Sequence, residues 1–217
     1  MSEPDVSAVL LFPSWRELAR RGPPLLVGIA LVSLGISLSV RAHLGISPWD
    51  VFHQGVSKHT GLSLGWVIVG VGVIVLLAWM PLHQKLGIGT VINTVAIGVL
   101  VKVFLPLIGA PHAMPARIAM FVAALAALGL GGGLYIGAAL GPGPRDGLMT
   151  AITARGHRLW VVRTVMEVSV LVVGWILGGN VGAGTAIIAF TIGPITHFTI
   201  RRFHLPVPPS SVEVLGE

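Results

Sequence analysis

The sequence contains no cysteine and few charged residues, and each shortage excludes a class of protein. Without cysteine the chain has no disulfide framework and no thiolate metal site. Charged residues make up only 10% of the 217 residues, whereas a soluble domain uses about 25% to cover its surface. Apolar residues make up 54%, and the mean hydropathy is +0.89. The missing polar surface indicates that lipid hydrocarbon, rather than water, surrounds most of this chain.

Six apolar runs each approach the roughly 20 residues that a helix needs to cross a membrane. The first run is not predicted to be a cleavable signal peptide, because Glu3 and Asp5 precede it and further runs follow. We therefore predict an all-α, polytopic membrane helix bundle of about six transmembrane helices. The predicted spans are 24–40, 62–82, 86–107, 118–140, 159–177 and 181–200.

Both ends of the chain are predicted to lie outside the membrane. In segment 1–22, Ser14 and Glu17 have the spacing of a capping box, which favours a short interfacial helix, with a frayed tail as the alternative. Segment 204–217 is rich in proline and is expected to be a disordered tail.

The basic residues predict the orientation. Six crossings place both termini on one side, and with that side inside, ten of the fourteen Lys and Arg lie inside. This bias follows the positive-inside rule, so both termini are expected in the cytoplasm and the spans in the bacterial plasma membrane. The net charge of +6 then reflects topology, and nucleic-acid binding is not expected. The four outside residues are Arg41, Lys58, Lys102 and Arg117.

Two motifs recur in the same order. GISPWD at 45–50 matches GPGPRD at 141–146, and GIGT at 87–90 matches GAGT at 182–185. Each half then holds three crossings, and because three is odd the second half is inverted. We predict two inverted-topology membrane repeats, residues 23–110 and 111–203. Such repeats occur in secondary transporters, whose sites form where interrupted helices of the two halves meet, but also in proteins that transport nothing.

Two short helices are predicted at 48–58 and 144–155, each starting with proline. Ser47 is placed as N-cap and Asp50 at the third helical position, and Asp146 repeats that position. Capping alone explains these carboxylates, which stabilise a helix start by about 0.3–1 kcal/mol. Alternatively, the two helices dip back toward the membrane centre and present their N–H groups to a ligand. The sequence leaves interfacial and re-entrant placement open.

Three more polar residues lie inside predicted spans. Arg163 and Glu167 are four residues apart, so they share a helix face and either satisfy each other or contact a ligand or proton. Asn93 is typical of an interhelical hydrogen bond, with ligand binding as the alternative. The candidate substrate-binding residues are Trp49, Asp50, Asn93, Arg145, Asp146, Arg163 and Glu167.

No catalytic, metal-binding or cofactor-binding residues are predicted. His53 and His59 lie six residues apart and do not share a helix face. The aspartates follow prolines without a further motif of an intramembrane aspartyl protease, and no Walker, Rossmann or Ser-His-Asp pattern is present. Close helix packing is predicted along a series of small residues on the fourth span. That series is Gly129, Gly133, Gly137 and Gly141, and it matches Ser33, Ser37, Arg41 and Gly45 on the first span.

These motifs, together with VRTVME at 162–167, resemble the YczE/YitT-type family of small bacterial integral membrane proteins. The resemblance covers about residues 23–202, and the polar positions at 49, 50, 145, 146, 163 and 167 fall on recurrent polar positions of that family. Lys102 is a departure, because an acidic residue is expected there. The resemblance implies a multi-pass membrane protein and supplies no substrate.

The first functional hypothesis is a gradient-driven small-solute transporter or exporter with its site between the two repeats. The alternative is a non-transporting accessory or scaffold membrane protein that assists a partner enzyme or assembly, and an intramembrane enzyme is a weaker third. The expected partners are the lipid bilayer and an unknown small solute, with a homo-oligomer left open. No ATP-hydrolysing motif is present, so any transport would be driven by a gradient or would need a partner.

The topology is tested with reporter fusions. Fusions after Glu217 and near Leu82 should report a cytoplasmic location, and a fusion near Ala110 should report an extracytoplasmic one, because three crossings separate Ala110 from the N-terminus. A cytoplasmic signal at Ala110 would contradict the six-helix topology.

Overall fold

The computed structural model describes residues 8–10, 13–207 and 213–214. Within these residues the chain is almost entirely helical, and the only strands are two residues each: β1 (Ala8–Val9) pairs antiparallel with β2 (Glu213–Val214). The all-α fold class is therefore confirmed. The helices are α1 (Trp15–Ala42), α2 (Pro48–Thr60), α3 (Leu64–Trp79), the 3-10 turn η1 (Met80–Leu82), α4 (Ile88–Leu107), α5 (Met114–Gly137), α6 (Pro144–Thr153), α7 (Leu159–Ile176) and α8 (Ala183–Phe203).

Six helices are long and apolar enough to cross a membrane, as predicted: α1, α3 with η1, α4, α5, α7 and α8. The predicted capping box is present, because Ser14 and Glu17 bond each other's backbone N–H groups. The helix that it starts is not a separate interfacial helix, however. It continues through Pro23 and Pro24 into the first span, so α1 is 28 residues long. Most of the predicted tail, 208–217, lies outside the described residues.

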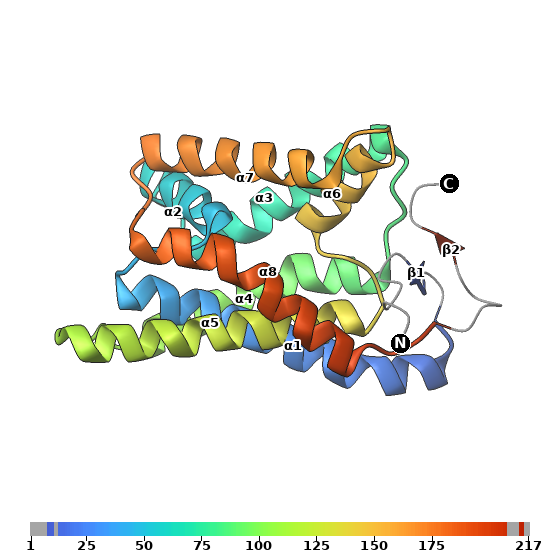
Figure 1. The fold of residues 1–217 in the computed structure, drawn as a ribbon, viewed down its shortest axis with the longest axis horizontal. Helices are drawn as coiled ribbons and strands as arrows, with labels where there is room; N and C mark the ends of the chain where they lie inside the picture. The colour runs from blue at the N-terminus through green and yellow to red at the C-terminus, as the bar shows by residue number, and fades with distance from the viewer. Residues whose placement is uncertain (1–7, 11–12, 208–212, 215–217) are drawn as a thin grey trace.

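The helices form two groups of four in chain order, and corresponding helices run in opposite directions. Figure 1 shows α1 running against α5, α3 against α7 and α4 against α8, with β1 and β2 at one end. α1 packs on α5 at the centre, α4 on α1, and α8 on α5. The short helices cross over between groups, because α2 packs on α7 and α6 packs on α3.

Glycines allow α1 and α5 to touch backbone to backbone. A Cβ added to Gly28 would lie 2.7 Å from the carbonyl oxygen of Gly131, and one added to Gly131 would lie 2.6 Å from that of Gly28. Lipid is as apolar as a leucine side chain, so such close van der Waals contact is what drives helices together in a membrane.

The predicted series of small residues on α5 serves a second contact. Gly129 and Gly133 face α8, where an added Cβ would overlap Ile195 and Thr199. The prediction was wrong for Gly141, which is not on this helix. α5 ends at Gly137, and Gly141 lies in the following loop with a φ of 132°.

Two arginines each bind a carbonyl oxygen at the C-terminal end of a neighbouring helix. Arg117, at the start of α5, donates from Nε to the carbonyl oxygen of Ala42 at 2.8 Å. Arg21, near the start of α1, donates from Nη1 to the carbonyl oxygen of Ala138 at 3.0 Å and to that of Leu205 at 2.9 Å. The last carbonyls of a helix lack partners within it, so each arginine satisfies groups that lipid cannot.

Replacing Arg21 by Met should therefore lower the unfolding temperature of the purified protein. Each net hydrogen bond to a charged group is worth about 1.5–3 kcal/mol, and the substitution also leaves buried carbonyls unpaired. The matched control is Arg20→Met, because Arg20 directly precedes Arg21 on the same helix and its side chain is exposed. Equal unfolding temperatures for the two variants would contradict the stabilising role of Arg21.

Candidate functional site

Two helices are too short to cross the membrane. α2 has 13 residues and α6 has 10, so at 1.5 Å per residue they span about 20 and 15 Å, against about 30 Å of hydrocarbon. Both begin at the predicted prolines. The start of α6 is held inside the molecule, because buried Trp79 donates from Nε1 to the carbonyl oxygen of Pro144 at 3.0 Å.

The loops before α2 and α6 have the same unusual backbone. His43 and Ala139 adopt left-handed conformations with φ of 52° and 53°, and Gly45 and Gly141 follow with φ of 119° and 132°. L side chains rarely adopt this conformation, so glycine suits both turns. Space also requires it at Gly141, where a Cβ would lie 2.5 Å from Oγ1 of Thr90.

The two repeated motifs bind each other across the halves. The N–H of Gly184 donates to the carbonyl oxygen of Leu44 at 2.7 Å, and the N–H of Gly89 donates to that of Leu140 at 2.8 Å. The loop that starts α2 is therefore bonded to the start of α8, and the loop that starts α6 is bonded to the start of α4. Sequence analysis identifies both motifs but not this exchange of partners.

Asp50 is buried in the first turn of α2, and Ser47 is the N-cap of this helix, as predicted. The Ser47 hydroxyl donates to Oδ2 of Asp50 at 2.5 Å, and the Asp50 N–H donates to Oγ of Ser47 at 3.3 Å. The other carboxylate oxygen lies 3.6 Å from Nδ1 of His53. Trp49 is half-buried and its ring centroid is 6.3 Å from that of His53. Sequence analysis did not select His53, although it lies one helical turn from Asp50.

Asp146 has different partners. The Tyr135 hydroxyl donates to its Oδ2 at 2.7 Å, and Nε of Arg145 lies 3.8 Å from its Oδ1. The N-cap residue, Gly143, has no side chain to bond it. Tyr135 is the only tyrosine of the chain and is buried. Sequence analysis did not select it, although a lone tyrosine within a glycine-rich span was a usable signal.

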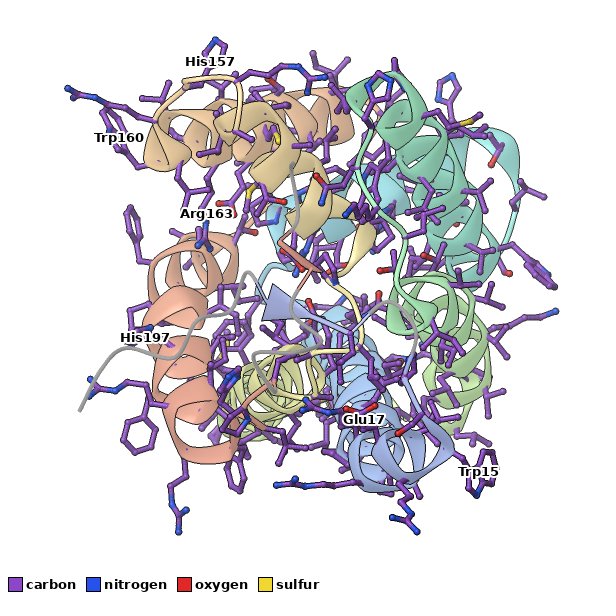
Figure 2. The ribbon with its side chains drawn as sticks, turned by 90° about the vertical axis from the view of Figure 1, so that its right-hand side faces the viewer. Trp15, Glu17, His157, Trp160, Arg163 and His197 are labelled. Carbon is purple, nitrogen blue, oxygen red and sulfur yellow. The ribbon has the colours of Figure 1, made fainter. Side chains whose placement is uncertain are left out.

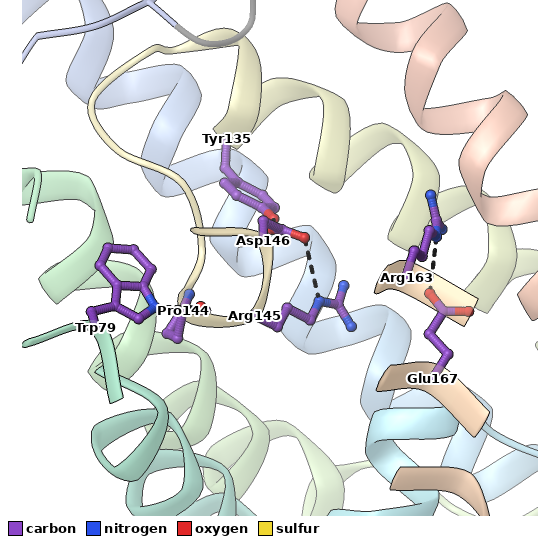
Figure 3. Close-up of polar contacts among 7 residues, drawn as sticks. All are labelled: Trp79, Tyr135, Pro144, Arg145, Asp146, Arg163 and Glu167. Carbon is purple, nitrogen blue, oxygen red and sulfur yellow. Dashed lines mark hydrogen bonds and ion pairs between the residues drawn. The ribbon is translucent and has the colours of Figure 1, made fainter. Parts of the chain in front are cut away.

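Arg145 connects charged residues from three helices. Besides Asp146 and Tyr135, the carboxylates of Asp50 on α2 and Glu167 on α7 act electrostatically on its guanidinium. Figure 3 shows its side chain extending from α6 toward α7. Although these helices surround it, 49% of its side-chain surface is accessible. Asp50, Arg145, Asp146 and Glu167 therefore form one charge cluster, in which the Arg145 side chain is half exposed.

Arg163 and Glu167 pair on one face of α7, with Nε and Oε1 3.1 Å apart. In Figure 2, viewed from the end that carries β1 and β2, Arg163 extends from α7 toward α8. A Cβ on Gly193 of α8 would lie 3.7 Å from its guanidinium. The expected pair exists, and Glu167 joins it to the charge cluster.

Asn93 is the seventh predicted residue, and it lies on α4 near the start of α6. It is 5% exposed, and its Nδ2 has no hydrogen-bond partner. Its Oδ1 would lie 3.6 Å from a Cβ added to Gly143. The structure thus brings Asn93, Arg145 and Asp146 together, with Asp50 and Glu167 close by and Trp49 and Arg163 at the edges. Among the described residues, no three His, Cys, Asp or Glu converge on a metal position.

Comparison with known proteins finds relatives of similar length. The chain is 35% identical over 187 residues to an uncharacterized protein of Haemophilus influenzae, covering 84% of this chain and 86% of the relative. It is 34% identical over 204 residues to the uncharacterized membrane protein YczE of Bacillus subtilis, covering 93% and 91%. No solved structure matches.

One family model covers most of the membrane region. It is described as a family of unknown function, DUF6198, and it matches residues 19–201. The similarity to YczE confirms the expected YczE-type resemblance. With its six apolar helices, the chain is an integral membrane protein that belongs to the DUF6198 family.

Proposed function

We propose that this protein is a gradient-driven transporter of a small solute, with its binding site at the charge cluster between the two halves of the chain. The observation that carries the proposal is the accessibility of Arg145. A charge at membrane depth is costly and usually marks a pathway or a pair. A purely structural ion pair would be sealed, whereas about half of the Arg145 side chain remains open beside three carboxylates.

The arrangement of the halves supports transport. We propose that residues 23–110 and 111–203 are inverted-topology repeats, which is consistent with the opposite directions of corresponding helices. The reciprocal contacts fit as well: Arg21 and Arg117 are 96 residues apart, and so are their acceptors Ala42 and Ala138. In transporters of this kind, interrupted helices from both repeats form the site. Here α2 and α6 would be those helices.

The two halves also differ in a way that alternating access requires. α3 packs closely on α4, where an added Cβ on Gly65 or Gly98 would overlap the other residue. α7 and α8 do not pack along each other in this way. They move apart with distance from the loop that connects them. Trp160, at the start of α7, is exposed. We propose that the solute reaches the charge cluster between α7 and α8, and that the α3–α4 contact closes the opposite route.

The predicted membrane orientation gives the side from which the solute enters. With both termini in the cytoplasm of a bacterial cell, the diverging ends of α7 and α8 face the cytoplasm. The structure would then correspond to an inward-facing state.

Substitution of the two aspartates tests the site. Asp50→Asn and Asp146→Asn keep competent helix-start residues but remove charge, so membrane abundance should stay normal while rescue of a deletion strain is lost. Glu167→Gln should behave alike. The matched control is Glu17→Gln, which removes an exposed capping carboxylate and leaves a residue that a capping box accepts.

Both the abundance in membranes and the deletion phenotype are measured for every variant. Full rescue by Asp50→Asn and by Asp146→Asn would mean that the carboxylates only cap helices. The accessory or scaffold function would then be the better interpretation.

A further inference from the structure

A buried imidazole nitrogen beside the charge cluster has no hydrogen-bond partner. It is Nδ1 of His53, and it lies 3.6 Å from Oδ1 of Asp50, too far for a hydrogen bond. Both side chains belong to α2, one helical turn apart, and they are only 12% and 7% exposed. Native proteins leave few buried polar atoms unpaired, so this nitrogen requires an explanation.

A proton on this nitrogen supplies the missing bond. The neutral imidazole has one nitrogen that accepts and one that donates, whereas both nitrogens of the charged ring donate. With a proton on Nδ1, His53 can donate to the Asp50 carboxylate, and a small movement would shorten the 3.6 Å contact to the 2.7–2.9 Å that is typical of a charged hydrogen bond. Histidine is also the side chain whose charge ordinarily changes within the physiological pH range.

The surroundings of the pair make the imidazole, rather than the carboxylate, the group that takes the proton. The negative charge of Asp50 is stabilised by the Ser47 hydroxyl, which donates to Oδ2, and by the positive start of α2, because Asp50 lies in the first turn. His53 lies in the second turn, where the effect of the helix start has largely ended.

Few other charged groups face this pair. α2 packs on α3 and α7, and α3 contains no charged or titratable side chain. α7 contributes Arg163 and Glu167, which pair with each other. Beyond α7, Arg145 of α6 interacts electrostatically with the carboxylates of Asp50 and Glu167. The imidazole is therefore the one group here that has no partner of its own.

The charge balance fits the uptake of one proton. The charge cluster and Arg163 together hold three carboxylates and two guanidinium groups, which leaves one excess negative charge. A net charge at membrane depth is costly. One proton on the neighbouring imidazole brings the sum to zero.

The second half of the chain has no such proton acceptor. Asp146 corresponds to Asp50 in the repeated motif, and three residues further on Met149 stands where the first half has His53. Asp146 is bonded by the Tyr135 hydroxyl instead. A short helix of this kind can therefore start without an imidazole, so the capping role of the motif does not explain His53.

We propose that His53 is the proton-binding group of the charge cluster, and that the gradient which drives transport is a proton gradient. Nδ1 takes a proton from water and later returns it, and no other bond forms or breaks. The bound proton acts on the cluster through Asp50, which faces the imidazole and also interacts with Arg145. The role in transport rests on the proposed function, whereas proton binding is measured on the purified protein alone.

The test is a double-mutant cycle between His53 and Asp50, which compares the wild type, His53→Gln, Asp50→Asn and the double variant. Thermal unfolding of the purified full chain is measured at about pH 5.5 and about pH 8.5, on either side of the ordinary histidine range. The ion pair exists only while the imidazole is charged, so its contribution is present at the lower pH and lost as the pH rises. The coupling should be worth roughly 3–10 °C of unfolding temperature at the lower pH and should vanish at the higher pH.

The matched control is the same cycle with His59→Gln in place of His53→Gln. His59 is exposed near the end of the same helix, so it should show no coupling to Asp50 at either pH. His53→Met is a second variant, because the second half accepts methionine at the corresponding position.

A measurement on the wild type alone applies if these variants fail to fold. Exchange of the imidazole C2 hydrogen with deuterium, followed by peptide mass spectrometry, reports the protonation of each histidine separately. The exchange rate at His53 should change between the two pH values.

A coupling of equal size at both pH values would overturn the proposal, because a neutral imidazole would then bond Asp50 for structural reasons only. The absence of coupling at both pH values would also overturn it. Lost rescue by Asp50→Asn together with either result removes the proton but leaves the transport proposal standing. A pH-dependent coupling supports proton binding even if Asp50→Asn rescues the deletion strain, and only its role in transport would then fail.

Discussion

The backbone contact between α1 and α5 is the constraint on which the rest of this structure depends. Gly28 and Gly131 bring the two helix backbones together, and no side chain could lie between them. Because the helices are antiparallel, each end of the pair presents the start of one helix beside the end of the other. Arg21 and Arg117 bond across those ends, so the carbonyl groups of Ala138 and Ala42 at the two C-terminal ends are satisfied without water.

The site follows from how the chain leaves this central pair. After each helix the backbone turns at a left-handed residue and a glycine, and the loop is bonded to the opposite half. α2 and α6 therefore start within the molecule rather than at its surface. Their polar first turns would be unfavourable in lipid, but protein surrounds them on the sides where α3 and α7 pack. Charges from separate helices can then share one interior region.

Much of the fold was predictable, because lipid imposes simple rules on sequence. A span needs about 20 apolar residues, which is why all six spans were found and five of them within a few residues of both ends, whereas α1 begins at Trp15, well before the predicted start at residue 24. Serine and proline before Asp50 predicted the start of α2 for local reasons. Local rules also explain one error: nothing in the sequence shows that Ala139 is left-handed, so Gly141 was assigned to the helix before it.

The site was less predictable, because its composition depends on contacts between distant segments. Asp50, Arg145 and Asp146 were selected from their local motif, but the approach of Glu167 to Arg145 depends on how α7 packs. Tyr135 was readable as the only tyrosine of the chain, but its hydrogen bond to Asp146 was not. Arg117 follows Arg21 at the spacing of the repeated motifs, so the sequence alone could have shown that the two arginines correspond. Arg21 and Arg117 were interpreted only as markers of orientation, so their paired hydrogen bonds were missed.

The packing of Trp79 has a consequence for how the two halves evolve. Where α6 meets α3, Gly147 leaves room for the indole ring of Trp79. Where α2 meets α7, the glycine lies on the long helix instead, because Gly174 lies directly against Val51 and Phe52. The first half thus carries the larger residues at both contacts and the second half carries the glycines, so two copies of the first half would collide and two copies of the second would leave a void. Among homologues, positions 79 and 147 should covary in size, and a chimera built from two copies of one half should not assemble.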